Sequence, residues 1–330
     1  MNNLPTEIMV MILDLLDFTS QTRFIFTTKI NEYLIEYWKI TKMIKVNKKV
    51  LKWHYYDNLT NIKINKLLKN YPKKLQCLSF SRDFNEPINK GIIPNKVTNL
   101  IFGYWFNQRV DKLQKEAHEP SSIKNIEFGN FFNQKVDKLP SSIESITFGR
   151  YFNQTVDKLP LSIKNLEFGE RFNQSVDKLP SLIKSIKFGS CFNQSVDKLP
   201  SSIESIKFGY WFNQPVDNLP LSIKSIEFGC NFNQSIKNLP STITHLTHEW
   251  YFNKPLEDIP PSVTHLIIYC ERFNGNIPET ITHLTIKGTY TFNDKIPETV
   301  THLTLDTLKY IKVPKTVTTL IVNGKIEKNL

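Results

Sequence analysis

Apolar and polar residues follow one another along most of the chain in a pattern with a period of about 20 residues. The dipeptide Phe-Asn opens each unit, and from Phe132 to Phe252 it recurs at the same spacing six times in succession. In the unit FNQSVDKLPSLIKSIKFGSC, six apolar residues are expected to face inward: Phe172, Val176, Leu179, Ile183, Ile186 and Phe188. Because one such unit cannot bury its apolar side alone, the period predicts a repeat solenoid of stacked coils.

The second half of each unit predicts a β-strand. After each proline the chain reads I-x-x-I-x-F, for example Ile183, Ile186 and Phe188. That is the spacing of a leucine-rich-repeat strand, and its last three positions alternate. We therefore expect Ile186 and Phe188 to point inward, and Ser185 and Lys187 to point outward. The stacked coils should form a leucine-rich-repeat-like solenoid with a long parallel β-sheet on its concave face.

Two further positions recur for reasons that we expect to be structural. A glycine follows the strand in seven successive units, from Gly103 to Gly229, which favours a corner with positive φ or a close approach of two backbones. The asparagine of Phe-Asn stands beside a core phenylalanine, where a buried amide must be hydrogen-bonded. By contrast, Gln174, which follows Asn173, should point outward. We expect a structural ladder between neighbouring coils whose central members are Asn133, Asn153, Asn173, Asn193, Asn213 and Asn233.

The units become irregular at both ends of the chain, as the end units of a solenoid often do. The regular pattern runs from Pro72 to residue 322. We expect a helical domain at 1–40, a lysine-rich linker with a degenerate first coil at 41–71, the solenoid at 72–322 and a tail at 323–330.

Positive charge is concentrated near the N-terminus. The net charge is +11, and residues 39–74 contain eleven lysines against one acid, Asp57. Such a block is typical of segments that bind nucleic acid or anionic membranes. The alternative, which we favour, is a lysine-coated junction between two domains, because apolar residues such as Trp53, Tyr55 and Ile62 interleave with the lysines.

Several classes of protein are not indicated. No apolar run is long enough for a membrane span, and acidic residues interrupt the apolar start of the chain, so no membrane association and no secretory signal are expected. The four cysteines lack C-x-x-C spacing, which disfavours disulfides and zinc and favours a reducing, cytoplasmic location. Because catalytic and phosphate-binding motifs are also lacking, we predict no enzyme, no catalytic residue, no cofactor and no metal ligand.

The outward positions of the strands are the candidate binding surface. They differ from unit to unit while the inward positions hardly change, and their charges are mixed in sign. A nucleic-acid surface should be uniformly basic, so we expect a protein target. The candidate charged contacts are Lys184, Lys187, Glu204, Lys207 and Glu227. Aromatic residues just past the strands are candidate anchors along the rim of this face: Trp105, Phe131, Tyr151, Trp211 and Trp250.

Histidines occupy the first outward strand position in the last units. These candidate contacts, each in a Thr-His-Leu triplet, are His245, His265, His283 and His302. Four imidazoles in a row could bind a metal, respond to pH or form a recognition patch. They could equally be duplicated residues that merely stack on one another, which is the interpretation we favour.

The unit FNQxVDxLPxSIxxIxFG, which covers about residues 72–322, resembles the FNIP repeat, a relative of the leucine-rich repeat. The first 40 residues resemble an F-box, with Leu4-Pro5-Thr6-Glu7-Ile8 opening a helix and apolar residues following at helical spacing. The resemblance implies that the residues facing the adaptor Skp1 are Leu4, Pro5, Ile8, Ile12, Leu15 and Leu16. This pairing of domains is seen in amoebae and in the large DNA viruses that infect them.

The resemblance implies a non-enzymatic substrate-recognition adaptor. Its F-box would dock on Skp1 of a cullin-RING ubiquitin ligase, and its solenoid would bind an unknown target protein. The protein would be located in the cytoplasm, or in the host cytoplasm if it is viral. Two alternatives stay open. One is an interaction scaffold whose N-terminal helices only cap the solenoid, and the other, less expected, is nucleic-acid binding through residues 39–74.

Overall fold

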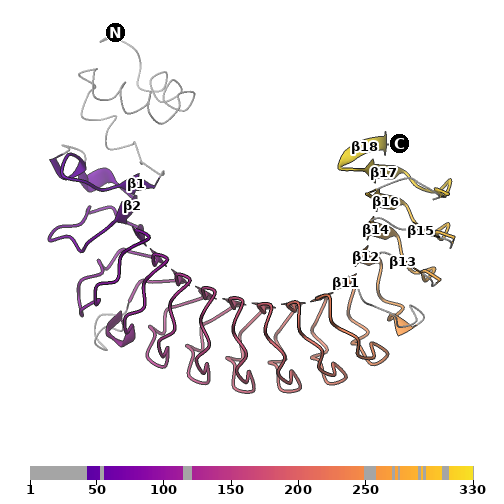
Figure 1. Ribbon diagram of the computed structural model, residues 1–330, viewed down its shortest axis with the longest axis horizontal. Coiled ribbons are helices and arrows are strands. Elements are labelled where there is room, and N and C mark those ends of the chain that lie inside the picture. Colours follow the sequence, from indigo (N-terminus) through magenta and orange to yellow (C-terminus); the bar gives the residue numbers. More distant parts are fainter. Residues whose placement is uncertain are drawn as a thin grey trace, which may run out of the picture.

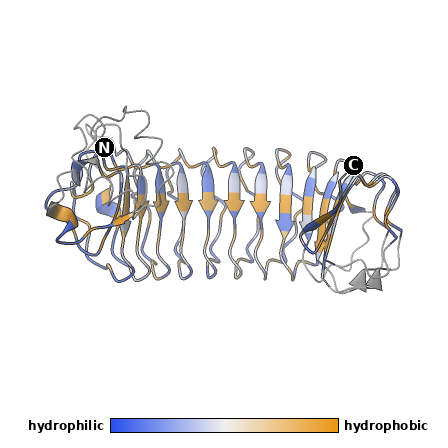
Figure 2. Cartoon of the chain, turned by 90° about the horizontal axis from the view of Figure 1, so that it is seen from above, coloured by the Kyte–Doolittle hydropathy of each residue, from blue (hydrophilic) through white to orange (hydrophobic). Residues whose placement is uncertain are grey.

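The chain forms an open arc of stacked coils with a single long β-sheet on its inner side (Figure 1). The computed structural model describes residues 43–52, 56–113, 121–248, 258–269, 272–273, 276–288, 291–292, 295–306 and 312–329. The return segments of the coils lie on the outer side of the arc, so the sheet lines the concave wall as expected (Figure 1). Seen from above, the strands lie side by side along the solenoid, and hydrophobic and hydrophilic positions mix within them (Figure 2).

In the described part of the chain the sheet has sixteen strands. In the order of the sheet they are β1 (Ile44–Lys45), β2 (Asn61–Ile64), β3 (Cys77–Phe80), β4 (Asn99–Ile101), β5 (Asn125–Glu127), β6 (Ser145–Thr147), β7 (Asn165–Glu167), β8 (Ser185–Lys187), β9 (Ser205–Lys207), β10 (Ser225–Phe228), β11 (His245–His248), β12 (His265–Tyr269), β14 (His283–Lys287), β16 (His302–Leu305), β17 (Thr319–Val322) and β18 (Lys325–Asn329). A second sheet pairs β13 (Arg272–Phe273) with β15 (Thr291–Phe292) in parallel.

The strands from β1 to β17 are parallel, and equivalent residues of successive units face one another. Ser185, for example, lies opposite Ser205, and Lys187 lies opposite Lys207. This register follows from the repeat, because a fixed number of residues per coil brings each position back to the same place in the sheet. The expected parallel sheet is confirmed.

The six apolar residues of the unit from Phe172 to Phe188 are all buried, with at most 9% of their surface exposed. The rings of Phe168 and Phe172 stack at 3.7 Å within one core layer, and those of Phe172 and Phe192 lie 6.0 Å apart in neighbouring coils. Flat side chains of equal size stack efficiently at the spacing of the coils, so two columns of phenylalanine fill the core.

The strand column of phenylalanines ends at Phe228 in β10. In β11 its place is taken by His248, which is 4% exposed and whose ring lies 6.1 Å from those of Phe228 and Phe232. Aliphatic residues then replace the aromatic ones, at Ile268 and Ile286. The core therefore changes from aromatic to aliphatic where the units of the sequence become irregular.

The repeated glycines allow close approach of neighbouring coils. A Cβ atom built on Gly189 would lie 1.9 Å from the backbone oxygen of Gly169, far inside van der Waals contact. The described glycines with positive φ are Gly91, Gly288 and Gly324, none of which belongs to the repeated column. Of the two reasons expected for glycine after the strand, the structure confirms close approach of two backbones and not positive φ.

The sheet extends beyond the expected solenoid at both ends. β1 and β2 fall inside the segment 41–71 and pair with each other, so the solenoid begins well before residue 72. Residues 323–330 are not a free tail, because the chain reverses at Asn323 and Gly324 and β18 pairs antiparallel with β17. The degenerate first coil expected within 41–71 thus belongs to the sheet, whereas the tail expected from residue 323 contains a paired strand, because backbone pairing requires no Phe-Asn motif.

Helical structure in the described part of the chain is limited to three short 3-10 turns: η1 (Val50–Lys52), η2 (Tyr56–Asn58) and η3 (Asp111–Leu113). The helical domain expected at 1–40 lies outside the described residues, and so do all six residues proposed to face Skp1. No helix among the residues with described structure is long and apolar enough to cross a membrane.

Candidate functional site

The concave face carries polar side chains in columns that run across the strands. One column stands directly before the strands, with the members Lys124, Glu144, Lys164, Lys184, Glu204 and Lys224. Another stands at the end of each strand, with the members Glu127, Thr147, Glu167, Lys187, Lys207 and Glu227. Successive members of a column belong to neighbouring coils, so their charges interact directly.

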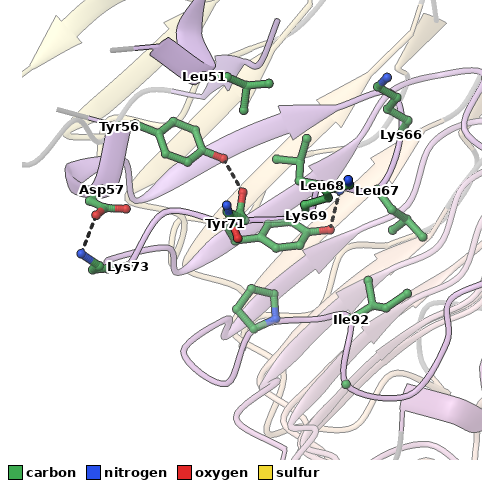
Figure 3. Close-up of a pocket in the computed structure, with 13 residues that line it drawn as sticks. Leu51, Tyr56, Asp57, Lys66, Leu67, Leu68, Lys69, Tyr71, Lys73 and Ile92 are labelled. Atoms are coloured by element: carbon green, nitrogen blue, oxygen red, sulfur yellow. Dashed lines mark hydrogen bonds and ion pairs between the residues drawn. The ribbon is translucent and has the colours of Figure 1, made fainter. Parts of the chain in front are cut away.

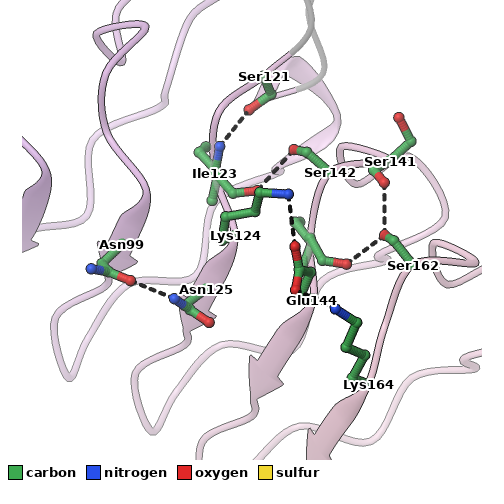
Figure 4. A network of polar contacts seen from close by, with 11 residues as sticks. Asn99, Ser121, Ile123, Lys124, Asn125, Ser141, Ser142, Glu144, Ser162 and Lys164 are labelled. Carbon is green, nitrogen blue, oxygen red and sulfur yellow. Dashed lines mark hydrogen bonds and ion pairs between the residues drawn. The ribbon is translucent and has the colours of Figure 1, made fainter. Parts of the chain in front are cut away.

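In the first column, each glutamate is held between two lysines. Glu144 accepts hydrogen bonds of 2.7 Å from Lys124 and 2.8 Å from Lys164, as Figure 4 shows. Glu204 is bridged in the same way by Lys184 at 2.8 Å and Lys224 at 3.0 Å. Hydrogen bonds from the flanking ammonium groups, with their positive charge, lower the pKa of both carboxyl groups to about 2.

In the second column, the charges also pair between coils. Lys187 contacts Glu167 at 2.5 Å, and Lys207 forms an ion pair with Glu227. The structure therefore brings together Lys184 with Glu204 and Lys207 with Glu227, all of which the sequence proposed. Glu167 was not among the candidate contacts. Its position is one repeat unit before Lys187, and the strand register places the two opposite charges side by side.

Hydroxyl groups tie the coils together beside these charges. Ser142 donates to the carbonyl oxygen of Ile123 at 2.8 Å, and Ser162 donates to that of Ile143 at 2.6 Å (Figure 4). The serine two residues after Leu-Pro thus has a structural role. In these coils it holds the turn that precedes β6 and β7 and so fixes the backbone from which the charged columns project.

The four histidines form a stacked column on the same face. The ring centroids of His245 and His265 lie 4.1 Å apart, those of His265 and His283 4.0 Å, and those of His283 and His302 4.1 Å, with interplanar angles of 18°, 14° and 11°. Each Nδ1 lies within 3.0 Å of the hydroxyl oxygen of the preceding threonine. Burial, together with the neighbouring imidazoles, lowers the pKa of His265 and of His283.

This column does not have the form of a metal site. Stacked rings direct their free nitrogens in parallel, so neighbouring imidazoles do not converge on one ion as ligands of a tetrahedral site do. Among the residues whose structure is described, no group of three or more His, Cys, Asp or Glu side chains could hold a metal. The arrangement agrees with the interpretation that each histidine stacks on the equivalent histidine of the neighbouring coil.

An aromatic and cationic row follows the corner after the strands, and we call it the rim row. Its members are Arg82, Tyr104, Trp105, Phe131, Tyr151 and Arg171. The rings of Trp105 and Phe131 stack at 4.2 Å, and those of Phe131 and Tyr151 lie 4.6 Å apart. The guanidinium group of Arg82 lies 4.7 Å from the Tyr104 ring, and that of Arg171 lies 4.6 Å from the Tyr151 ring.

Three of the predicted aromatic anchors, Trp105, Phe131 and Tyr151, thus lie together in the rim row. Trp211 is separate and contacts Tyr210 edge-on, while Trp250 lies outside the described residues. The arginines at both ends of the row were missed. Their signal in the sequence was their rarity, since the chain has six arginines among 42 basic residues.

The asparagine ladder lies on the return half of the coils. The backbone N–H groups of Asn153, Asn173 and Asn193 each donate, at 2.9 Å, to the side-chain oxygen of the asparagine one coil earlier. Gln194 adds a bond of 3.0 Å to the same oxygen of Asn173. The ladder members are half-buried or exposed, so the expectation of buried amides was wrong. Gln174 is half-buried, and its side chain donates to Asn153.

Ion pairs also cross the coils on the return side. Lys178 lies 3.5 Å from Asp157, and Lys198 lies 3.1 Å from Asp177. Like the pairs of the concave face, they join a lysine of one coil to an acid of the neighbouring coil, although their lysines are more exposed. They therefore offer a matched control for variants of the concave lysines.

A cavity of about 1210 Å³ opens at the basic N-terminal end of the arc (Figure 3). Leucine and isoleucine side chains line it together with Lys66, Lys69 and Lys73. Tyr56 donates to the backbone oxygen of Asn70 at 3.0 Å, and burial raises the pKa of Tyr56 to about 12. The described lysines between residues 56 and 74 therefore belong to the first coils of the solenoid.

Comparison with known proteins agrees with this architecture. A family model described as FNIP Repeat matches residues 65–105, 120–151, 132–170, 152–191, 172–211, 192–231, 212–249 and 232–271, which together make up more than half of the chain. No curated protein matches the sequence.

Two solved structures match this chain. The crystal structure of CroV588, a novel circular LRR protein structure, is 27% identical, with a TM-score of 0.55, over 80% of this chain and 50% of that chain. The present chain thus spans about half the length of CroV588. YopM from Yersinia enterocolitica WA-314 is 14% identical, with a TM-score of 0.39, over 81% of this chain and 64% of that chain.

Proposed function

The chain belongs to the FNIP repeat family, and from this premise we propose that it is a non-enzymatic recognition adaptor whose concave sheet binds a target protein. Repeat solenoids of the leucine-rich-repeat type generally serve protein interactions through their concave surface. The observation that carries the proposal is the contrast between the two sides of the sheet. The inward side repeats the same residues, whereas the outward column changes from Glu127 to Thr147, Lys187 and Lys207.

The charge of the concave face supports a protein target. Lysines and glutamates are mixed there and pair between coils, so the face has no uniformly positive stripe that would follow a phosphate backbone. These side chains are partly exposed, for example to 28% for Glu227 and 55% for Lys184, and can instead exchange internal partners for those of a complementary protein surface.

We further propose that residues 1–40 dock on Skp1 and so connect the solenoid to a cullin-RING ubiquitin ligase in the cytoplasm. This part of the proposal rests on the F-box resemblance of the sequence that begins at Leu4-Pro5. Among the described residues the first paired strand begins at Ile44, and residues 1–40 precede it in the sequence. The competing hypothesis is that they only cap the solenoid.

Purified host Skp1 tests the docking step directly. The full chain should bind Skp1, and Leu4→Ala with Pro5→Ala should abolish binding while thermal unfolding of the solenoid stays nearly unchanged. If instead the original chain fails to bind Skp1 and the double variant lowers the melting temperature, residues 1–40 act as a cap.

Charge reversal tests the target surface. Lys187→Glu with Lys207→Glu places like charges beside Glu167 and Glu227 and should weaken target capture from host lysate, measured by quantitative mass spectrometry of the retained proteins. Lys178→Glu with Lys198→Glu breaks equivalent pairs on the return side and should leave capture intact. Loss of capture with the return-side pair alone would contradict binding at the concave face.

A further inference from the structure

The rim row is more ordered than a set of scattered surface aromatics. Its rings and guanidinium groups contact one another in sequence over successive coils, with Arg82 at one end and Arg171 at the other. Trp105, in the middle, still has 43% of its surface exposed. Exposed clusters of Trp, Tyr and Arg are the composition typical of binding hot spots.

The arginines indicate that this geometry is specific. The chain has 36 lysines and six arginines, yet Arg82, Arg150 and Arg171 all lie against rings at this corner. A guanidinium group is planar and stacks on an aromatic face while its edge keeps donating hydrogen bonds, which an ammonium group does not do. Arg150 is paired with Glu170 at 2.7 Å, but the described residues provide no carboxylate for Arg82 or Arg171.

The rim row continues into the most basic part of the molecule. Residues 43–112 carry twelve lysines and two arginines against four acids, a net charge of +10. Residues 1–42 carry −1 in total, which leaves only +2 for residues 113–330. The strand register places Lys66, at the edge of the cavity in Figure 3, one coil before Arg82. A ligand lying along the rim row therefore enters a positive field at one end.

The stacking within the rim row disfavours nucleic acid as that ligand. Bases bind single-strand proteins by stacking on open aromatic faces. Here Phe131 lies between Trp105 and Tyr151, and Tyr151 lies between Phe131 and Arg171, so these faces are already covered. At Phe131 and Tyr151 the ring edges remain accessible, and these carry the positive part of the ring quadrupole; the edges of the guanidinium groups remain accessible beside them. Both are complementary to carboxylates and to backbone carbonyl oxygens.

We propose that the rim row, together with Lys66, binds an extended acidic segment of a partner protein. From Lys66 to Arg171 the surface crosses five steps between neighbouring coils, from β2 to β7. At about 4.8 Å per step this is about 24 Å, the length of about seven residues of extended chain. The inference deepens the proposed function by naming the chemistry of a partner at a second surface, beside the concave face.

A defined probe tests this surface without knowledge of the natural target. The probe is a labelled peptide that alternates glutamate and leucine and spans the rim row, and its affinity for the full chain is measured by fluorescence anisotropy at physiological salt. Arg82→Gln with Arg171→Gln should weaken binding by about tenfold or more, because charge-assisted hydrogen bonds are lost. Trp105→Ala should weaken it by a similar factor through loss of the central contact.

Two controls separate the rim row from general attraction by a basic protein. Arg109→Gln with Lys135→Gln removes the same charge from the return side, and Trp211→Ala removes an exposed tryptophan outside the rim row. Both should change affinity less than about twofold. Equal losses in the two charge variants, or no binding of the peptide by the unchanged protein, would overturn the proposal.

A labelled oligothymidylate of the same net charge tests the other class of ligand. It should bind more weakly than the peptide and be insensitive to Trp105→Ala. Tighter binding that Trp105→Ala abolishes would assign the surface to single-stranded nucleic acid instead. This assay involves neither Skp1 nor the concave lysines, so a negative result would not contradict the proposed function. Likewise, a loss of target capture by the concave variants would not contradict binding of an acidic segment at the rim row.

Discussion

The side-chain oxygen of Asn153 accepts a hydrogen bond of 2.9 Å from the backbone N–H of Asn173, the equivalent residue one coil further along the chain. The same oxygen accepts a second bond, of 3.1 Å, from the side chain of Gln174. One asparagine thus joins two donors of the next coil, and the bond recurs in seven consecutive steps from Asn85 to Asn233. This relationship explains why Asn-Gln follows phenylalanine in the regular coils.

Removal of one ladder oxygen should therefore destabilise the solenoid. Asn173→Ala leaves the N–H of Asn193 and the amide of Gln194 without their acceptor and should cost about 1–2 kcal/mol in the free energy of unfolding, measured with urea. Asn173→Asp keeps an acceptor oxygen and should cost less. Gln174→Ala removes one exposed bond and should cost about 0.5 kcal/mol. Equal losses for alanine and aspartate at position 173 would show that the acceptor is not what matters.

The close approach of the coils predicts a severe effect at the repeated glycine. In Gly189→Ala the new methyl group would meet the backbone oxygen of Gly169 at 1.9 Å, so the two coils must separate. We expect a loss of at least about 2 kcal/mol and a lower melting temperature, as in other overpacked sites. Ser190→Ala, the adjacent surface position, should change stability by less than about 0.5 kcal/mol. A tolerated Gly189→Ala would mean that the coils are less closely packed than the structure shows.

The lysines that bridge Glu204 predict an unusual acid titration. Because ion pairing lowers the pKa of the folded carboxyl group to about 2 from 4.5, the contribution of these pairs to stability is present above the unfolded value and is lost as the pH falls through about 2. Side-chain carboxyl signals in NMR should show Glu204 ionised down to that range. Lys184→Gln with Lys224→Gln should return the pKa of Glu204 towards 4.5, whereas Lys178→Gln should not. A Glu204 pKa near 4.5 in the unchanged protein would show that the lysines do not hold this geometry in solution.

The histidine column predicts a loss of stability in mild acid. The folded pKa values of His265 and His283 lie below 6.5, so the unfolded chain takes up protons first and stability falls as the pH drops through 6.5. The ring proton signals of His265 and His283 in NMR should titrate at lower pH than a free histidine.

Thermal melts should show the same effect as a melting temperature that decreases from about pH 8 to about pH 5. His265→Gln with His283→Gln should flatten this dependence, and a control at an exposed lysine of the same half, Lys295→Gln, should not. An unchanged slope in the double histidine variant would assign the acid sensitivity to other groups.

The sequence by itself determined the coil. A constant unit length returns each position to the same place, so the inward set from Phe172 to Phe188, the strand around Ile186 and the parallel register all follow from the repeat. The candidate charged surface follows as well, since the residues that alternate with a buried strand set must face outward. These conclusions need only the periodicity of one coil and the fact that coils stack.

Only the tertiary structure decided how neighbouring coils meet. The pairing of Lys187 with Glu167, the close approach at Gly189 and the half-exposed ladder at Asn173 depend on the distance and curvature between coils, which no single unit contains. The ends show the same limit, because β1 joins the sheet and β18 folds back on it without any repeat motif. Backbone hydrogen bonds can extend or cap a sheet with almost any residue. A repetitive sequence therefore determines the interior of a solenoid, whereas the packing of the whole chain determines its boundaries and the contacts between its coils.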